Sequence, residues 1–201
     1  GAAGLQLDSG GLTLGQPSVS GTTYTWTYAV KQGDLGAYAL SATCLDAAGN
    51  PGQAPGAGDL AIDGTVPTVT VTGLDKGPHK SPKGTEPDVV GHVKFTTTED
   101  LDPKTKNVVV TVGDAAVACP DGAVKEFACT YTVPRDLLTG DALEGLKVVT
   151  VAVVDAAGNG TTVTAGTMTF DFTAPQLTMA IAPAGRPVKM GEQLTVSVAA
   201  S

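Results

Sequence analysis

The chain contains the stretch Asp46-Ala47-Ala48-Gly49-Asn50 twice, the second time as Asp155-Ala156-Ala157-Gly158-Asn159. The two copies are 109 positions apart (155 − 46). A boundary with Asp, Thr and Pro follows each copy, at 62–67 and at 170–175, and its proline recurs after 108 positions (175 − 67). Two nearly equal spacings indicate a structural unit repeated in tandem, which in β proteins of this repeat length is one sandwich per repeat.

The composition favours strands and turns over helices. The 201 residues include 26 Gly and 13 Pro, only 16% are charged, and the hydrophobic fraction of 42% is that of packed globular proteins. A net charge of −8 disfavours nucleic acid and anionic membranes as partners and suits divalent cations better. No apolar run is long enough to predict a membrane insertion, and Gly1-Ala2-Ala3-Gly4 lacks signal-peptide features, so an export signal would lie outside these residues.

Alternating apolar and polar residues predict seven short strands in the unit 63–172. We expect them at 68–72, 89–97, 107–112, 115–118, 125–133, 146–155 and 161–172. Seven Thr- and Val-rich strands separated by Gly, Pro and Asp predict an all-β fold, an immunoglobulin-like sandwich. The segment 134–143, before the penultimate strand, is expected to form one helical turn.

The repeated stretch separates the last two strands of the unit, so it predicts a hairpin turn. In each copy the Asp would bond to its own backbone, and Gly-Asn would adopt positive φ at little cost. Turn chemistry is the first interpretation, and an added ligand role is the second. The turn residues are Asp46, Gly49 and Asn50 in the first copy and Asp155, Gly158 and Asn159 in the second.

The residues before Asp63 predict an incomplete unit. The stretch 24–30 aligns with 127–133 at an offset of 103 (133 − 30), and the loop that follows is six residues shorter (109 − 103). Residues 1–62 are therefore expected to form a partial immunoglobulin-like repeat that holds only the later strands of a sandwich.

Residues 173–201 predict a second partial repeat, with only early strands at 177–181 and 194–199. A sandwich without all its strands exposes apolar faces and unpaired backbone groups, which proteins avoid. Two solutions are open at this point. Neighbouring repeats of a longer array complete the partial units, or the tail strands of one copy complete the first unit of the next and build a polymer from identical chains.

The pattern resembles the bacterial immunoglobulin-like repeats of large surface and secreted proteins. In these repeats Asp-Ala-Ala-Gly-Asn lies between two strands, and Asp-x-Thr-x-Pro precedes the next β run, as at 63–67 and 171–175 here. The resemblance covers nearly the whole chain, but turn residues specify architecture rather than function. It implies a stalk segment of an adhesin, a filament component, or a module attached to an extracellular enzyme.

Three cysteines carry further information. Cys119 and Cys129 flank the turn 120–123 in neighbouring strands, so they are expected to form a disulfide in an exported protein; two buried thiols are the alternative. Cys129 aligns with Trp26, so one unit would fill its core with a disulfide where the other uses an indole. Cys44 aligns with Val153 and is expected to be a small buried hydrophobic residue, unless it pairs with a residue outside this sequence.

The sequence predicts no catalytic site. Its two histidines are His79, in a loop expected to be exposed, and His92, on a strand, and neither accompanies a nucleophile motif, a zinc spacing or a phosphate-binding loop.

An acidic group is the one candidate for a metal. In a sandwich of this type the linker, the loop after the second strand and the last hairpin turn meet at the end facing the preceding domain. Carboxylates gathered there favour Ca²⁺, which would stiffen the joint, whereas a solvated acidic rim is the alternative. The candidate ligands are Asp63, Glu99, Asp100, Asp102, Asp155 and Asn159.

We therefore expect a non-catalytic, secreted or cell-surface bacterial protein that spans distance or assembles into a fibre, with neighbouring repeats or identical chains as partners. A glycan- or protein-binding adhesin module is the alternative, and it should expose aromatic side chains. Tyr24, Trp26 and Tyr28 alternate with Thr, however, and are expected inside. An accessory module of an extracellular hydrolase is a third reading.

Overall fold

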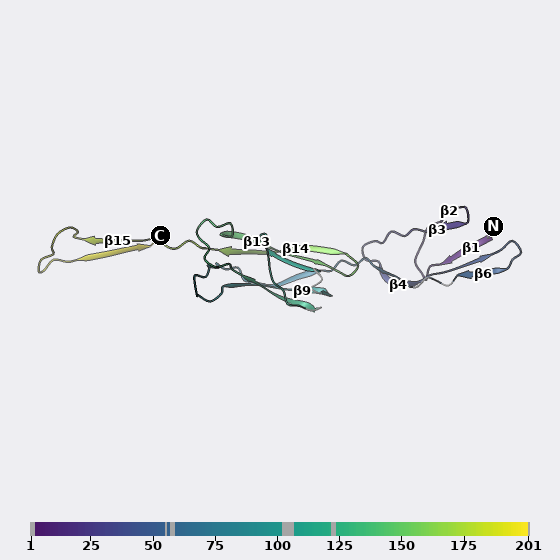
Figure 1. Cartoon of the computed structure of the whole chain (residues 1–201), viewed down its shortest axis with the longest axis horizontal. Helices are drawn as coiled ribbons and strands as arrows, with labels where there is room; N and C mark the ends of the chain where they lie inside the picture. Colours follow the sequence, from purple (N-terminus) through teal and green to yellow (C-terminus); the bar gives the residue numbers. More distant parts are fainter. Residues whose placement is uncertain (1–2, 55, 57–58, 102–106, 122–123, 201) are drawn as a thin grey trace.

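The protein is all-β, as the sequence predicted. A computed structural model describes residues 3–54, 56, 59–101, 107–121 and 124–200, and these form antiparallel strands joined by turns, with no helix among them. Figure 1 shows an elongated molecule with three parts in a row: N-terminal strands, a central sandwich and a C-terminal hairpin.

The central part is a β-sandwich of two antiparallel sheets. One sheet has the order β12-β9-β8 and the other the order β11-β10-β13-β14. The strands are β8 (Val69–Leu74), β9 (Val90–Leu101), β10 (Val108–Val112), β11 (Ala115–Ala116), β12 (Val124–Thr132), β13 (Gly145–Val154) and β14 (Gly160–Phe170). All seven lie where the alternation predicted strands, and β9 extends further than expected because Leu101 pairs with Val124 of β12.

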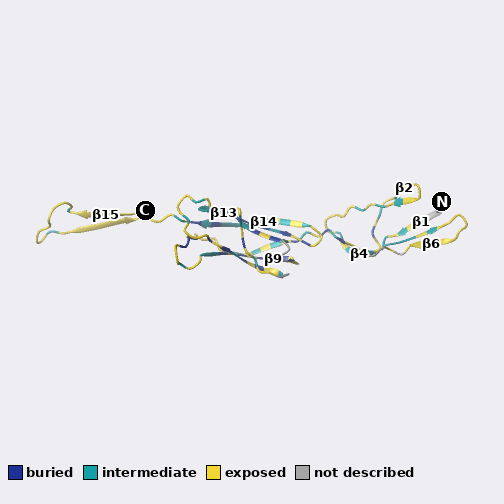
Figure 2. Cartoon of the chain, in the orientation of Figure 1, coloured by how far each residue is buried: buried dark blue, intermediate teal, exposed yellow. Residues whose placement is uncertain are grey.

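The core lies between these two sheets and follows from the period-two alternation of each strand. On β9, Val93 and Phe95 are 0% and 1% exposed, and on β13 Val151 is fully buried. Phe95 lies opposite Phe127 of β12, and their rings stack with centroids 4.8 Å apart. Figure 2 shows that the buried residues concentrate in this part of the chain.

The predicted disulfide joins Cys119 and Cys129, whose Cα atoms are 4.1 Å apart. Cys129 is fully buried on β12, and the backbone of its neighbour Thr130 bonds in both directions with Ala118. The bridge therefore fixes the chain that leaves β11 against a strand of the opposite sheet. Cys44 is a free, half-buried thiol.

The predicted helical turn at 134–143 is wrong. This segment forms successive turns, in which Asp136 adopts a left-handed φ of 58°. A distant residue imposes this path: the Ser81 hydroxyl donates to the carbonyl of Pro134 (2.9 Å) and accepts from the amide of Leu137 (2.9 Å). These bonds replace the local ones that a helix would need.

The N-terminal strands form three small sheets, β1-β5-β6, β4-β7 and β2-β3. Among the described hydrophobic residues before Asp63, only Leu12 and Ile62 are buried. The strands are β1 (Ala3–Asp8), β2 (Ser18–Ser20), β3 (Thr23–Thr25), β4 (Leu35–Ala39), β5 (Ser41–Leu45), β6 (Pro51–Ala54) and β7 (Asp59–Asp63).

The C-terminal part is a two-stranded hairpin of β15 (Leu177–Ala182) and β16 (Thr195–Ala200). Every described residue of both strands is exposed. Figure 2 shows the hairpin extending away from the sandwich.

Candidate functional site

The second copy of the repeated stretch forms the turn between β13 and β14. The Asp155 amide donates to the Asn159 carbonyl (2.9 Å), and the Asp155 carboxylate accepts from the amide and the side-chain nitrogen of Asn159, both at 2.8 Å. Gly158 has a φ of 95°, a conformation that glycine adopts without a steric cost. Asp155 is 4% exposed, so its carboxylate is held inside the fold.

The first copy forms the same turn between β5 and β6 but on the surface. The Asp46 carboxylate accepts from the amide (2.8 Å) and the side-chain nitrogen (2.7 Å) of Asn50, and Gly49 has a φ of 87°. Asp46 and Asn50 are both exposed. The two turns therefore share their internal bonds and differ in what covers them.

The second turn is covered by the linker between the N-terminal strands and the sandwich. The side-chain nitrogen of Asn159 donates to the backbone carbonyl of Asp63 (3.0 Å). The next residue, Gly64, bonds instead to the N-terminal part of the chain. Its amide donates to the Asp34 carbonyl (2.7 Å), and its carbonyl accepts from the Gly33 amide (3.0 Å). The linker is thus tied to the parts of the chain on both of its sides.

Glycine is required at position 64. A Cβ atom there would lie 2.2 Å from the Lys31 carbonyl oxygen, far closer than atoms can approach. No sequence pattern identified Gly64, Asp34 or Gly33 as joint residues. The variable second position of Asp-x-Thr-x-Pro, which is Gly64 here and Phe172 at the second boundary, was the available signal.

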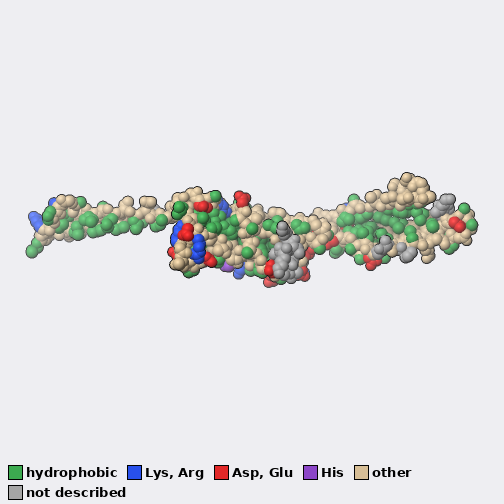
Figure 3. All heavy atoms as spheres, viewed as in Figure 1, with side chains coloured by type: hydrophobic (Ala, Val, Ile, Leu, Met, Phe, Trp, Pro, Cys, Tyr) green, Lys and Arg blue, Asp and Glu red, His purple; other side chains and the backbone are tan. Residues whose placement is uncertain are grey.

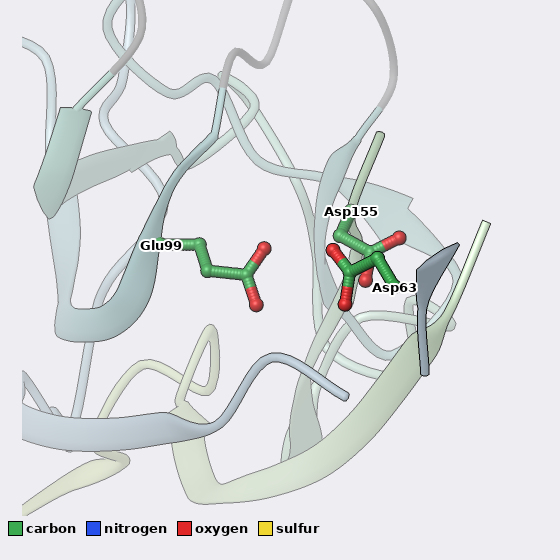
Figure 4. A group of neighbouring side chains, drawn as sticks. All are labelled: Asp63, Glu99 and Asp155. Atoms are coloured by element: carbon green, nitrogen blue, oxygen red, sulfur yellow. The ribbon is translucent and has the colours of Figure 1, made fainter. Parts of the chain in front are cut away.

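Three carboxylates meet at this joint. Asp63 of β7, Glu99 of β9 and Asp155 each place an oxygen within 4.8 Å of the others, and Figure 4 shows Glu99 extending toward the other two. Asp63 and Glu99 are half-buried and also line a surface groove with Thr65 and Thr98. We call Asp63, Glu99 and Asp155 the carboxylate cluster.

The environment shifts two of these groups in opposite directions. Burial, followed by the charges of Asp155 and Asp63, raises the pKa of Glu99. Burial also acts to raise the pKa of Asp155, but the hydrogen bonds from Asn159 and from nearby backbone amides outweigh it and hold that pKa below its ordinary value. At neutral pH the cluster therefore holds Asp155 ionised and opposes the ionisation of Glu99.

The other predicted ligands differ in their placement. Asp100 is exposed on β9 and, by strand alternation, points to the opposite face from Glu99. Asp102 lies outside the described residues. Asn159 is next to the cluster, where its side-chain nitrogen donates to the Asp155 carboxylate and to the Asp63 carbonyl. Ca²⁺ would bind its side-chain oxygen instead.

Calcium binding stays a prediction. Ca²⁺ takes roughly six to eight oxygen ligands, of which the carboxylate cluster supplies three residues. Titration calorimetry of the full chain tests it: a heat of binding that disappears in Glu99→Gln would support a site, and the absence of any heat would remove it.

Replacing Glu99 with glutamine should raise the melting temperature of the sandwich at pH 7 in EDTA. A carboxyl whose pKa is raised by folding binds a proton more tightly in the folded state, so its contribution to stability is lost as pH rises through the folded pKa. The gain from Glu99→Gln should therefore vanish below about pH 4, where both states are protonated. Calorimetric melts across this range measure it, with the exposed neighbour Asp100→Asn as control. Equal melting of wild type and Glu99→Gln at pH 7 would contradict it.

The histidines do not form part of this joint. The expectation that His79 is exposed is wrong, because it is 6% exposed and its ring packs on Phe170 with centroids 5.5 Å apart. Its backbone extends the edge of β14, donating to the Thr169 carbonyl (2.8 Å) and accepting from Asp171 (3.0 Å). His92 is exposed on β9.

The aromatic residues before Asp63 are half-buried. Tyr24, Trp26 and Tyr28 alternate with exposed Thr residues, as their spacing predicted, but none is fully enclosed. Tyr24 and Trp26 stack with centroids 6.3 Å apart, and the Tyr28 hydroxyl donates to Asp34 (2.7 Å).

Comparison with known protein families, with curated proteins and with solved structures finds no match to this chain. Within the described residues no helix is long and apolar enough to cross a membrane.

Proposed function

We propose that this chain is a load-bearing spacer of a secreted or cell-surface bacterial protein, built from tandem immunoglobulin-like sandwiches and without catalytic activity. Its role is to keep other parts of a stalk, fibre or adhesin apart. The alternative of an aromatic-lined ligand site has less support, because Phe95, Phe127, Tyr131 and Phe170 lie in the core.

The repetition of strand register is the observation that carries this proposal. Gly36 pairs with Ile62 as Gly145 pairs with Phe170, at offsets of 109 (145 − 36) and 108 (170 − 62). Leu7 likewise pairs with Ala42 as Val110 pairs with Val151. Matching registers in sheets far apart along the chain support one sandwich plan used more than once.

The joint at Asp63 and Gly64 supports a mechanical role. Asn159 holds the linker from the sandwich side, and Asp34 and Gly33 hold it from the N-terminal side. Bonds on both sides restrict bending between neighbouring units, which is what a spacer requires. The disulfide between Cys119 and Cys129 supports an oxidising, extracellular setting.

Pulling the full chain from its two ends tests the proposal. The central sandwich should unfold in one force peak, because its two sheets share a single core. Extended chain spans about 3.5 Å per residue, so reducing the disulfide should lengthen the extension of that event by roughly 35 Å, because its two cysteines are ten positions apart in the sequence. Cys119→Ser/Cys129→Ser should show the longer extension without reductant. Extension without a force peak would contradict a load-bearing role.

A further inference from the structure

The C-terminal hairpin presents an apolar face with nothing over it among the described residues. Leu177, Met179 and Ile181 on β15 lie opposite Ala200, Val198 and Val196 on β16. The five large side chains are 47% to 70% exposed, whereas the opposite face carries Thr, Ser and Ala. Figure 3 shows the hydrophobic side chains running along the hairpin. An isolated two-stranded hairpin is marginally stable in water, so this face needs a partner.

The hairpin matches β8 and β9 of the sandwich in its pairing. Val71 pairs with Phe95 as Met179 pairs with Val198, at offsets of 108 (179 − 71) and 103 (198 − 95). Val69 and Thr97 match Leu177 and Ala200 at the same two offsets. Val196 and Val198 thus correspond to Val93 and Phe95, which are buried in the sandwich core.

The N-terminal strands correspond to the rest of the sandwich. Residues 24–30 align with 127–133 of the sandwich, where β12 receives β9 along its edge. The N-terminal strands and the sandwich differ in how far corresponding core residues are enclosed. Leu60 is 40% exposed, whereas its counterpart Met168 is fully buried. Cys44 is likewise half-buried, whereas its counterpart Val153 is 1% exposed. The strands that would cover these residues are the counterparts of β8 and β9.

We propose that the β15–β16 hairpin of one copy docks on the N-terminal strands of a second copy and completes its sandwich. β16 would lie antiparallel to residues 24–30, with Val196 opposite Trp26 and Val198 opposite Tyr24, as Val93 lies opposite Cys129 and Phe95 opposite Phe127. The inference rests on the proposed sandwich plan and adds the identity of its partner.

The linker before the hairpin supports the same geometry. The Asp171 carboxylate accepts from the Thr173 amide (3.0 Å), as that of Asp63 accepts from Thr65 (2.9 Å). Docking would therefore bring Asp171 to the exposed Asn50 turn, as Asp63 lies against Asn159 in this chain.

A second copy is the occupant, rather than the same chain. The N-terminal strands and the hairpin lie at opposite ends of the molecule with the sandwich between them (Figure 1). Docking joins two different surfaces head to tail, and such an interface extends into an open filament when its rotation does not close a ring.

Engineered cysteines test the register directly. In the sandwich, Thr130 of β12 pairs with His92 of β9. The corresponding residues across the proposed interface are Thr27 and Thr195, so the crosslinking pair is Thr27→Cys with Thr195→Cys, made in a Cys44→Val background. Mild oxidation should give a ladder of covalent multimers on non-reducing denaturing gels. The control moves one cysteine to Thr23, about 13 Å along the strand, and should give little ladder. Equal ladders from both pairs, or none from either, would overturn the proposal.

The single tryptophan gives an independent readout. Trp26 is half-buried in the free chain and would be enclosed after docking, so its emission should shift to shorter wavelength as the concentration of wild type rises. Val198→Asp places a charge on the docking face and should raise the concentration at the midpoint of this shift about a hundredfold or more. Ser197→Asp, on the opposite face, should leave it near the wild-type value.

Identical behaviour of Val198→Asp and Ser197→Asp, or emission independent of concentration, would overturn docking. The spacer proposal would stand in that case if the sandwich still gave its force peak. Loss of the force peak with docking intact would instead remove the spacer proposal.

Discussion

Replacing Phe95 with alanine is expected to lower the free energy of unfolding of the central sandwich by about 3–5 kcal/mol. Phe95 is 1% exposed and stacks on Phe127 from the neighbouring strand, so the substitution leaves a cavity between the two sheets. A loss of this size is a large share of the stability of a domain, roughly 5–15 kcal/mol. Calorimetry of the oxidised full chain should show the sandwich melting on the order of 15 °C lower.

Two substitutions serve as controls for this result. Lys94→Ala changes the exposed neighbour on the same strand and should leave the transition nearly unchanged. Phe95→Leu keeps most of the apolar volume and should fall between wild type and Phe95→Ala. A loss below about 1 kcal/mol for Phe95→Ala would mean that the two sheets do not pack as described.

Replacing Asp155 with alanine is expected to destabilise the sandwich by about 2–4 kcal/mol. The carboxylate accepts two hydrogen bonds from Asn159 in a buried position, and removing it leaves both donors without that acceptor. Asn159 would also lose the orientation that directs it to the Asp63 carbonyl. Calorimetric melts at pH 7 measure the loss.

The repeated turn offers a matched control for Asp155. Asp46→Ala removes the same bonds from an exposed turn, where water can replace them, and should leave the transition of the central sandwich in place. Asp155→Asn keeps the shape and removes the charge, so it should lose less than Asp155→Ala. Equal effects of Asp46→Ala and Asp155→Ala on that transition would show that burial of the second turn does not matter.

The sequence predicted those features that depend on local patterns. Alternation placed Val93 and Phe95 inside β9, because a strand exposes and buries its residues in turn. The short spacing of Cys119 and Cys129 around the turn 120–123 predicted their disulfide, although Cys119 lies after β11 and not in a strand that pairs with β12. Both features depend on residues that are close together in the sequence.

Features that depend on distant contacts were harder to predict. His79 is buried because its backbone adds to the edge of β14, some ninety positions further along the chain (170 − 79 = 91). Asp100 is not part of the carboxylate cluster, because β9 continues to Leu101 instead of ending near Thr97. Strand alternation, and not a loop, therefore determines where the Asp100 side chain points. The cluster of Asp63, Glu99 and Asp155 is a distant contact that could be predicted, because the predicted order of strands places the linker, the end of the second strand and the last turn at the same end of a sandwich.

Sedimentation equilibrium of the 201-residue chain tests the central claim that its two ends fit each other as parts of one sandwich. The average mass of wild type should rise with concentration from 20.0 kDa through its multiples, while Val198→Asp stays at 20.0 kDa over the same range. A wild-type chain that remains at 20.0 kDa at every concentration would contradict the account.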